Sequence, residues 1–243
     1  MNASEFEGLT LGQDLNSWSA KQVVSWAWDT FREDLVLSCG FVADDMVLLD
    51  MLSRTGAKPL IVVIDSGRLF PETLDFIEKV VDRYRINLSF FFPDTKRLHD
   101  YLAANSPNAF RHDHGLRLEC CEIRRHEPLR RALAGRKAWM AGLRRSHGGR
   151  RTAVNKVEMD PVHPDIAKIC PLADWSWEQV WAYAKEHNVP THPLYEKGFM
   201  SIGCAPCTRP SSSGDERGGR WWWEDPSQRE DGIHFTFSDV PSK

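Results

Sequence analysis

Short apolar segments alternate with amphipathic ones from residue 34 to residue 93. The apolar segments are DLVLSCG, PLIVVID and NLSFFFP, whereas VADDMVLLDMLSR and PETLDFIEKVVDRY have helical spacing, with acidic residues or proline in the first turn. Parallel strands cannot be joined by tight turns, so such helices serve as crossovers between them. The pattern predicts an α/β fold, in which a mostly parallel, twisted sheet has helices on both faces.

Further helices and a strand are expected outside this stretch. Residues 16–32 predict a helix with Ser19 as its N-cap, and four of its residues would face the sheet: Val23, Val24, Ala27 and Phe31. The segment KAWMAGL, residues 137–143, is expected to continue the sheet. Residues 175–187 predict another helix, with four inward-facing residues: Trp177, Val180, Trp181 and Ala184.

The chain is expected to form one large domain followed by a C-terminal extension. Its 243 residues include 42% hydrophobic and 27% charged residues, which is ordinary for a globular protein. Beyond Pro210 the stretch SSSGDERGG has the composition of a loop. We therefore expect a domain of residues 1–210 and a mobile tail of residues 211–243.

The same composition bounds the location and the ligand. No apolar run approaches the ~20 residues that span a bilayer, and the acidic start MNASEFEGL lacks the features of a signal peptide, so we expect a cytoplasmic protein without a membrane partner. The net charge of -3 conceals an arginine-rich block at residues 124–151. Such a block favours a polyanionic ligand; no nucleic acid is expected as a partner.

Two motifs follow predicted strands, where open α/β sheets bind their ligands. LSCGFVADDM, residues 37–46, places small residues before a helix N-terminus, a natural anion site. IDSGRLFPET, residues 64–73, adds an arginine that can pair with phosphate or sulfate. Ordinary turns, with Asp44 and Asp45 as helix-capping charges, remain the alternative. The candidate binding residues of the two motifs are Ser38, Gly40, Asp65, Ser66, Gly67 and Arg68.

Four of the six cysteines form two close pairs, Cys120-Cys121 and Cys204-x-x-Cys207. Four thiolates in two pairs can hold a tetrahedral zinc or an iron–sulfur cluster. Adjacent cysteines diverge and fit poorly around one zinc, which favours the larger [4Fe-4S] cluster, although zinc and four buried structural thiols remain alternatives. The remaining two, Cys39 and Cys170, are expected to be small core residues.

Arginines lie beside these motifs in three groups. Some are expected to be solvated, as most charge runs are. Groups placed at the end of an apolar segment or beside a ligand loop can instead clamp an anion through paired N–H donors. The candidates are Arg124, Arg125, Arg144, Arg145, Arg217 and Arg220.

These segments together resemble the assimilatory adenylylsulfate reductases, a branch of the sulfonucleotide (APS/PAPS) reductase family. The resemblance is carried from about residue 20 to residue 235 by SCGFVADDMVLLD, IDSGRLFPET, ECCEIRRHEPLRRAL, AWMAGLRR, PLADWSWEQVWAYAKEHNVPTHPLYEKGFMSIGCAPCTRP and DERGGRWWWED. The double cysteine pair is specific to the cluster-bearing branch. Relatives that lack this cluster generally reduce 3'-phosphorylated PAPS.

The resemblance implies an adenine nucleotide α-hydrolase-like (PP-loop) fold, with residues 1–210 as a nucleotide-binding and iron–sulfur domain. It implies a [4Fe-4S] cluster on Cys120, Cys121, Cys204 and Cys207, adenylylsulfate or AMP as ligand, and binding roles that include Gly142 and Arg125. It further implies an oxidoreductase of sulfate assimilation and cysteine biosynthesis that uses thioredoxin or a similar thiol donor and forms a homo-oligomer.

The chain departs from this family in its C-terminal segment. Relatives carry Glu-Cys-Gly-Leu/Ile-His, whose thiolate attacks the sulfate sulfur, whereas this chain has Glu230-Asp231-Gly232-Ile233-His234. Asp231 and His234 are therefore the candidate catalytic residues, but a carboxylate is a poor nucleophile towards sulfur and its product cannot be reduced by thioredoxin. Replacement of the thiol by Cys39 or Cys170 is a further hypothesis.

Two smaller departures concern the ligand. Relatives commonly have lysine at the position of Arg125, and after Arg145 they usually have Asp/Glu-Gln-Ser, where this chain has Ser146-His147-Gly148. Three hypotheses follow: an adenylylsulfate reductase or close functional variant, a diverged enzyme that transfers a sulfuryl or adenylyl group without a thiosulfonate intermediate, and a non-catalytic paralogue that binds a nucleotide or a partner reductase.

Overall fold

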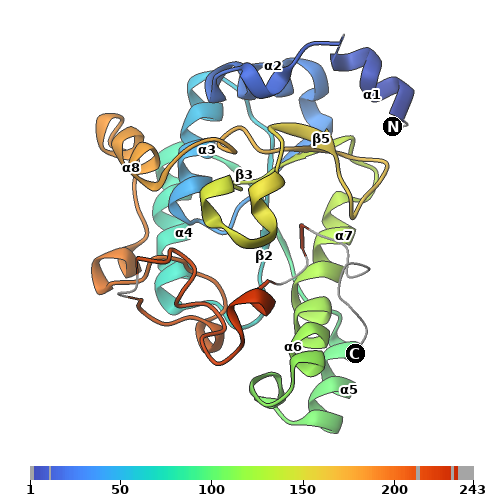
Figure 1. The fold of residues 1–243 in the computed structure, drawn as a ribbon, viewed down its shortest axis with the longest axis vertical. Helices are drawn as coiled ribbons and strands as arrows, with labels where there is room; N and C mark the ends of the chain where they lie inside the picture. The colour runs from blue at the N-terminus through green and yellow to red at the C-terminus, as the bar shows by residue number, and fades with distance from the viewer. Residues whose placement is uncertain (1–2, 11, 212–213, 231–232, 235–243) are drawn as a thin grey trace.

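The computed structural model describes residues 3–10, 12–211, 214–230 and 233–234. Within them a six-stranded sheet has the order β3-β2-β1-β4-β6-β5 (Figure 1). Adjacent strands are parallel except β5 and β6, which are antiparallel. The strands are β1 Leu35–Ser38, β2 Leu60–Ile64, β3 Asn87–Phe91, β4 Ala138–Met140, β5 Val157–Met159 and β6 Ala167–Ile169. The predicted α/β class and mostly parallel sheet are confirmed.

Helices pack on both faces of the sheet because successive strand residues point to opposite sides. Leu35 and Leu37 of β1 join one core cluster and Val36 joins the other. The first cluster is covered by α2 Ala20–Phe31, α3 Ala43–Arg54, α4 Pro71–Tyr84 and α8 Trp177–Glu186, and the second by α7 Glu127–Leu133. A short helix, α1 Ala3–Thr10, precedes α2.

The predicted start of the first amphipathic helix is confirmed. Ser19 caps α2, and its side chain forms a reciprocal capping box with Gln22. For α8 the predicted inward face needs a correction, because Trp177 and Trp181 are only partly buried whereas Tyr183 is buried. The hydroxyl of Tyr183 donates to Asp50 Oδ2 at 3.0 Å, which turns this side chain into the core.

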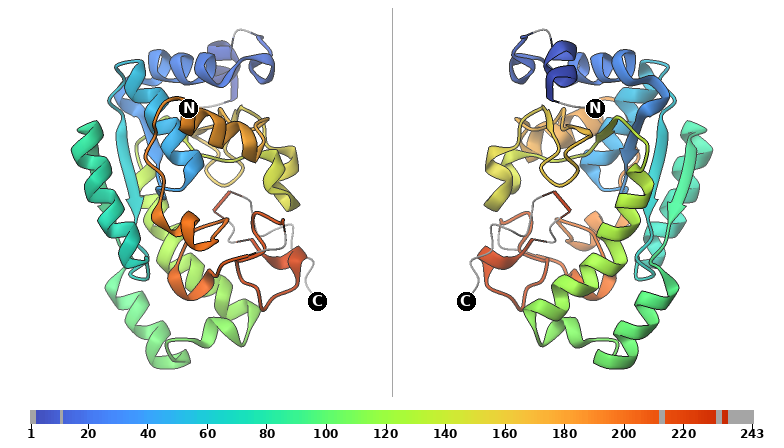
Figure 2. Two further views of the ribbon diagram at one scale, coloured as in Figure 1. Left: turned by 90° about the vertical axis from the view of Figure 1, so that its left-hand side faces the viewer. Right: turned by 90° about the vertical axis from the view of Figure 1, so that its right-hand side faces the viewer.

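A third cluster lies outside the two faces of the sheet. It is built on α5 Thr95–Asn105 and on α6 His114–Cys121, which continues through a π-helical turn, Glu122–His126, into α7. The chain from residue 214 to residue 230 lies beside α6 in both views of Figure 2, and its Trp221 is 1% exposed within the cluster. This part of the predicted tail therefore packs on the domain.

Candidate nucleotide and cysteine site

A cleft opens at the carboxyl ends of β1 and β4, where the strand order reverses direction. Its walls include the loop after β1, residues 38–42, and the loop after β4, residues 141–143. Residues 200–204 and several arginines close the other side, around a volume of about 190 Å³. Ligands of doubly wound sheets bind at this kind of switch point because loops diverge there in opposite directions.

Asp45 ties the two loops of the cleft together. The N–H of Gly40 donates to Asp45 Oδ2 at 2.7 Å, and the N–H groups of Val42 and Gly142 also donate to this carboxyl group. Burial raises the pKa of Asp45 to about 7 in spite of these donors. Position 142 requires glycine, because a Cβ there would lie 2.6 Å from Asp45 Oδ1 and 2.7 Å from Asp44 Cβ.

Arg144 is fully buried and forms ion pairs with Asp44 and Glu216. Burial alone would raise the pKa of Asp44, but His147 and Arg144 hold it below its ordinary value. Because the Asp44 and Glu216 carboxylates neutralise it, the Arg144 guanidinium supports the wall of the cleft. Arg144 is not among the described residues that line the cleft. Arg145 also lies off the described lining; it donates to the Val154 carbonyl at 2.8 Å and to Asn16 Oδ1 at 3.3 Å.

The segment between β2 and α4 contributes Ser66 and Leu69 to the described lining. Gly67 has φ +69°, and its N–H donates to Asp65 Oδ1 at 2.8 Å, so these two residues shape the turn. Arg68 extends away, donating to the Pro107 carbonyl at 2.5 Å with its guanidinium 5.0 Å from the Phe110 ring centroid. Of the six predicted residues in the two motifs, Ser38, Gly40 and Ser66 line the cleft.

Four arginines do line the cleft: Arg125, Arg151, Arg217 and Arg220. Arg151 was missed at the sequence level, although it belongs to the basic block from 124 to 151 that favoured an anionic ligand. Positive charge of this kind, set at the switch point of the sheet, suits an anionic nucleotide.

Two of the described histidines line the cleft, and both lie in segments where this sequence differs from the family that it resembles. His147 lines it next to Asp44 and Glu216, 3.8 Å from each. The ring of His234 also lines it and stacks on Trp139, with 5.4 Å between centroids. Asp231 lies outside the described residues.

The four paired cysteines gather beside the cleft in the third apolar cluster. The thiol of Cys204 donates to Ser66 Oγ at 3.1 Å, so the cysteine site adjoins the cleft wall. Arg124 bridges the same two places, donating to the Ser66 carbonyl at 2.6 Å and hydrogen-bonding the Cys120 thiol. Gly203 leaves room for the Arg220 guanidinium next to this site, because a Cβ there would lie 2.2 Å from an Arg220 nitrogen and would displace this side chain.

The four thiols share apolar surroundings with arginines beside them. Burial raises the pKa of Cys207 to about 12 and also raises that of Cys120, while nearby arginines oppose the rise. Among the described residues no three or more His, Cys, Asp or Glu side chains are arranged to hold a single metal ion. Four thiols in apolar surroundings, with cations beside them, are the donor set that iron–sulfur clusters use.

The two remaining cysteines are buried. Cys170 is fully buried in the core cluster on the α7 side, and burial raises its pKa to about 12. Cys39 lines the cleft but is 2% exposed, and burial raises its pKa well above the ordinary value. A thiol with a raised pKa has little thiolate at neutral pH, which weakens the hypothesis that either replaces the missing nucleophile.

The strand order and the position of the cleft are those of an α/β protein of the adenine nucleotide α-hydrolase-like (PP-loop) fold class. Solved structures agree on the fold: FMN adenylyltransferase of Candida glabrata superimposes with a TM-score of 0.55 at 18% identity, over 80% of this chain and 62% of that one. The phosphoadenylyl-sulfate reductase of Candida auris has a TM-score of 0.69 at 27% identity, over 86% and 98% of the two chains.

Sequence comparison narrows this class further. Residues 34–210 match the phosphoadenosine phosphosulfate reductase domain. The adenosine 5'-phosphosulfate reductase of Allochromatium vinosum is 40% identical over 83% of this chain and 79% of its own, and that of Burkholderia cepacia is 42% identical over 84% and 82%. The chain therefore belongs to the sulfonucleotide reductase family of enzymes. No helix among the described residues is long and apolar enough to cross a membrane.

Proposed function

We propose that this chain binds 5'-adenylylsulfate in the switch-point cleft and holds a [4Fe-4S] cluster on Cys120, Cys121, Cys204 and Cys207. The observation that carries the proposal is the direct contact between the two sites, in which Cys204 Sγ lies 3.1 Å from Ser66 Oγ of the cleft wall. As a cluster ligand, the Cys204 thiolate would accept a hydrogen bond from the Ser66 hydroxyl. The family supplies the class of substrate, and the four cleft arginines supply the positive charge for its phosphate and sulfate. When bound, the cluster would tune the electrostatics of the neighbouring cleft through its iron, its sulfide and its four thiolates.

In the reaction expected for the family, a thiolate attacks the sulfate sulfur and AMP leaves with the electron pair of the S–O bond. The enzyme then carries a thiosulfonate, and the two thiols of thioredoxin release sulfite and become a disulfide. Asp231 breaks this sequence, because attack by its carboxylate would give an acyl sulfate anhydride that thiols cannot reduce. We therefore propose that this chain retains binding and lacks the nucleophile.

The test uses Asp231→Cys, with Ser227→Cys as the matched control on an exposed part of the same segment. Calorimetry should show adenylylsulfate and AMP binding to the unchanged protein and to both variants. Sulfite release with thioredoxin should rise about 10³-fold or more above background in Asp231→Cys alone, since loss of a nucleophile typically costs that much. Absence of nucleotide binding would refute the binding proposal, and an inactive but folded and iron-loaded Asp231→Cys would show that the pocket itself has changed.

Asp231 also motivates a second candidate, a diverged enzyme that transfers the sulfuryl or adenylyl group without a thiosulfonate. Mass spectrometry after incubation with adenylylsulfate, PAPS or ATP would detect its product, and recovery of only untouched nucleotide would reject it. In that case a non-catalytic, nucleotide-binding paralogue remains, for which a pull-down of a reductase is the positive result. Homo-oligomer formation stays an expectation from the resemblance, and a cytoplasmic location stays an expectation from the composition and the N-terminal sequence.

A further inference from the structure

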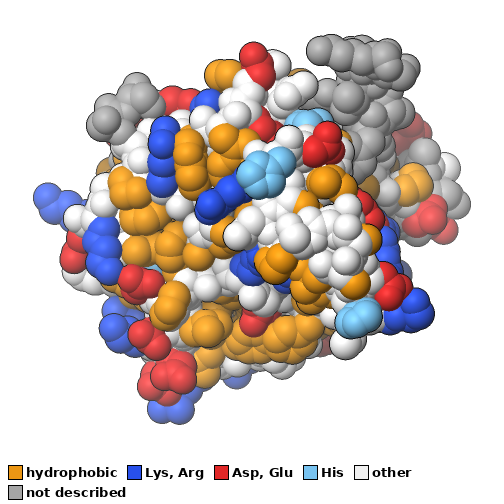
Figure 3. All heavy atoms as spheres, turned by 90° about the horizontal axis from the view of Figure 1, so that it is seen from below, with side chains coloured by type: hydrophobic (Ala, Val, Ile, Leu, Met, Phe, Trp, Pro, Cys, Tyr) orange, Lys and Arg blue, Asp and Glu red, His pale blue; other side chains and the backbone are white. Residues whose placement is uncertain are grey.

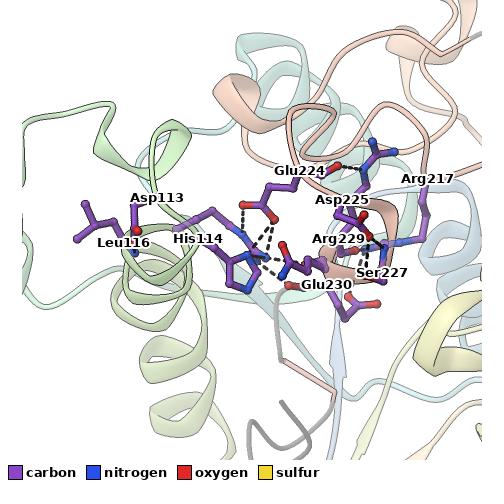
Figure 4. Close-up of polar contacts among 11 residues, drawn as sticks. Asp113, His114, Leu116, Arg217, Glu224, Asp225, Ser227, Arg229 and Glu230 are labelled. Atoms are coloured by element: carbon purple, nitrogen blue, oxygen red, sulfur yellow. Dashed lines mark hydrogen bonds and ion pairs between the residues drawn. The ribbon is translucent and has the colours of Figure 1, made fainter. Parts of the chain in front are cut away.

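Arg117 is buried on α6, three residues before Cys120, and is 1% exposed. Its Nε and Nη2 each donate at 2.9 Å to the carboxylate of Glu224. The same guanidinium donates to two backbone carbonyls, that of Gln228 at 2.8 Å and that of Glu230 at 2.6 Å. Figure 4 shows the Glu224 carboxylate turned toward α6 beside His114. One side chain of α6 therefore holds three points of the segment that leads into Asp231.

The other side of the Arg117 guanidinium faces the cysteine site. It forms a side-chain hydrogen bond with Cys121, and it lies 4.8 Å from the centroid of the Trp221 ring. Trp221 and Cys121 share the third apolar cluster. A planar guanidinium with five N–H donors can serve two groups at once, which a lysine ammonium cannot do in the same geometry.

The segment has a second attachment, on the cleft side. The carboxylate of Glu230 accepts from Arg151 at 2.8 and 2.9 Å and from Arg217 at 3.2 Å. Arg151 and Arg217 both line the cleft. Glu230 is therefore held through its backbone by α6 and through its side chain by the cleft wall, directly before position 231.

We propose that Arg117 is a positioning residue: it fixes residues 221–230 on the helix that carries Cys120 and Cys121, so that the cysteine site and the seating of the C-terminal segment depend on each other. If the segment lifts away, Glu224 and the two carbonyls become hydrated, but the buried Arg117 guanidinium loses its charged partner and two acceptors, and this uncompensated charge opposes detachment. The proposal rests on the proposed function in one respect, that Cys121 binds an iron–sulfur group.

Hydrogen exchange of the intact, anaerobically purified protein tests the anchor. Arg117→Met should speed amide exchange in residues 221–230 roughly a hundredfold, while exchange in β1 and β4 stays unchanged, because one partner of a buried ion pair is lost. Arg117→Lys keeps the positive charge but lacks the paired N–H donors of the guanidinium. Its exchange rate in residues 221–230 should lie between those of the unchanged protein and Arg117→Met. Arg130→Met is the matched control, since this arginine pairs with Glu122 on the surface of the same helical run. Equal exchange in Arg117→Met and Arg130→Met would overturn the proposal.

A second variant covers the outcome in which Arg117→Met does not fold. Glu224→Gln keeps the contact between Arg117 and Cys121 and removes only the charged partner on the segment. It should also speed exchange in residues 221–230, by a smaller factor, and should retain its iron. Unchanged exchange in this variant would contradict an anchor at Glu224.

The mutual dependence is tested by removing iron from the unchanged protein with an oxidant and a chelator. Exchange in residues 221–230 should rise on removal, with no comparable rise in Arg117→Met, where the link is already cut. If iron removal left the exchange rate of residues 221–230 in the unsubstituted protein as it was, the proposed dependence would be overturned. Iron analysis separates this result from the proposed function: protein that purifies without iron contradicts the cluster assignment, whereas iron-loaded protein whose exchange does not change on iron removal contradicts only the dependence.

Discussion

The cleft and the cysteine region are built in different ways. The base of the cleft is made of loops that directly follow adjacent strands, and it includes backbone N–H groups and glycines such as Gly40 and Gly142. The cysteine region has no strand among its described residues and is held by side chains that are far apart in the sequence. Arg117, for example, contacts residues 107 to 113 positions further along the chain.

The cleft and the cysteine region therefore depend on different interactions. Short connections from a strand to the helical element that follows it cost little conformational entropy to order, so the base of the cleft follows from the fold itself. The cysteine region must offset the ordering of long segments, and it does so with the buried ion pair of Arg117 and with arginine guanidinium groups that lie over the Trp221 ring. Figure 3 views the molecule from this end, where hydrophobic side chains alternate with basic ones on the surface.

The largest expected effect is the loss of iron from the cysteine region, with the fold of the sheet kept. Cys204→Ser should lose nearly all bound iron, because the site then has three thiols and an added buried hydroxyl. Cys170→Ala, the control, removes a sulfur from the core and should keep its iron at a cost of about 1 kcal/mol in the free energy of unfolding. Iron analysis and denaturant unfolding measure both. Full iron content in Cys204→Ser would refute the four-thiol assignment.

A large effect on the cleft side should depend on pH. Asp45 has a pKa of about 7 in the folded protein against an ordinary value of 3.8, so between these values the folded state binds a proton that the unfolded state has lost. The stabilisation is present below pH 4 and is lost as the pH rises to 7, by up to about 4 kcal/mol. The free energy of unfolding is measured against pH for the unchanged protein and for Asp45→Asn. The variant should lack the decline between pH 4 and pH 7, so the difference between the two curves gives the contribution of Asp45.

The control for this measurement is Asp225→Asn. Asp225 is exposed, and hydrogen bonds with Ser227 lower its pKa below the ordinary value, so it does not titrate between pH 5 and 8. Its substitution should leave the slope as it is. An Asp45→Asn curve parallel to that of the unchanged protein over this range would show that the Asp45 carboxyl is ionised in the folded state.

A smaller effect tests how strongly the cleft depends on close packing of its backbone loops. Gly142→Ala should cost about 2 kcal/mol and should lower adenylylsulfate affinity at least about tenfold, because the added methyl group must displace Asp44 and Asp45. Gly8→Ala, in α1, has no atom within 4 Å of the added Cβ and should change the unfolding free energy by less than about 1 kcal/mol. Normal affinity in Gly142→Ala would show that the loops tolerate separation.

The smallest expected effect separates arginines that line the cleft from those behind it. Arg151→Ala should weaken adenylylsulfate binding about tenfold, the value of one charge-assisted hydrogen bond. Arg145→Ala should change the affinity less than about threefold, because its partners are Val154 and Asn16. Calorimetry with adenylylsulfate measures both. A larger loss in Arg145→Ala than in Arg151→Ala would restore the sequence-based assignment of Arg145 to the ligand.

Much of the sheet could be predicted because its signals are local. The alternation from residue 34 to residue 93 marks three strands and two helices, and Ser19 marks a helix start through its own hydrogen bonds. Side-chain directions were harder. The inward face of α8 was predicted from hydrophobicity, but the distant Asp50 draws Tyr183 inward instead.

The arginines show the same limit at the site. Arg144, Arg145 and Arg151 come from one basic stretch, and nothing local distinguishes them. Asp44 and Glu216 neutralise the first, Val154 and Asn16 hold the second, and the third reaches the cleft.

The sequence by itself determined the family, the parallel sheet, the four cysteines and the missing thiol at position 231, because residue identity and short-range periodicity carry this information. Only the tertiary structure decided which cations line the cleft, that Asp45 binds both of its loops, and that Arg117 joins the cysteine helix to the C-terminal segment. Those outcomes depend on which buried charges meet across the fold, since each buried charge needs a partner that the chain supplies from far away.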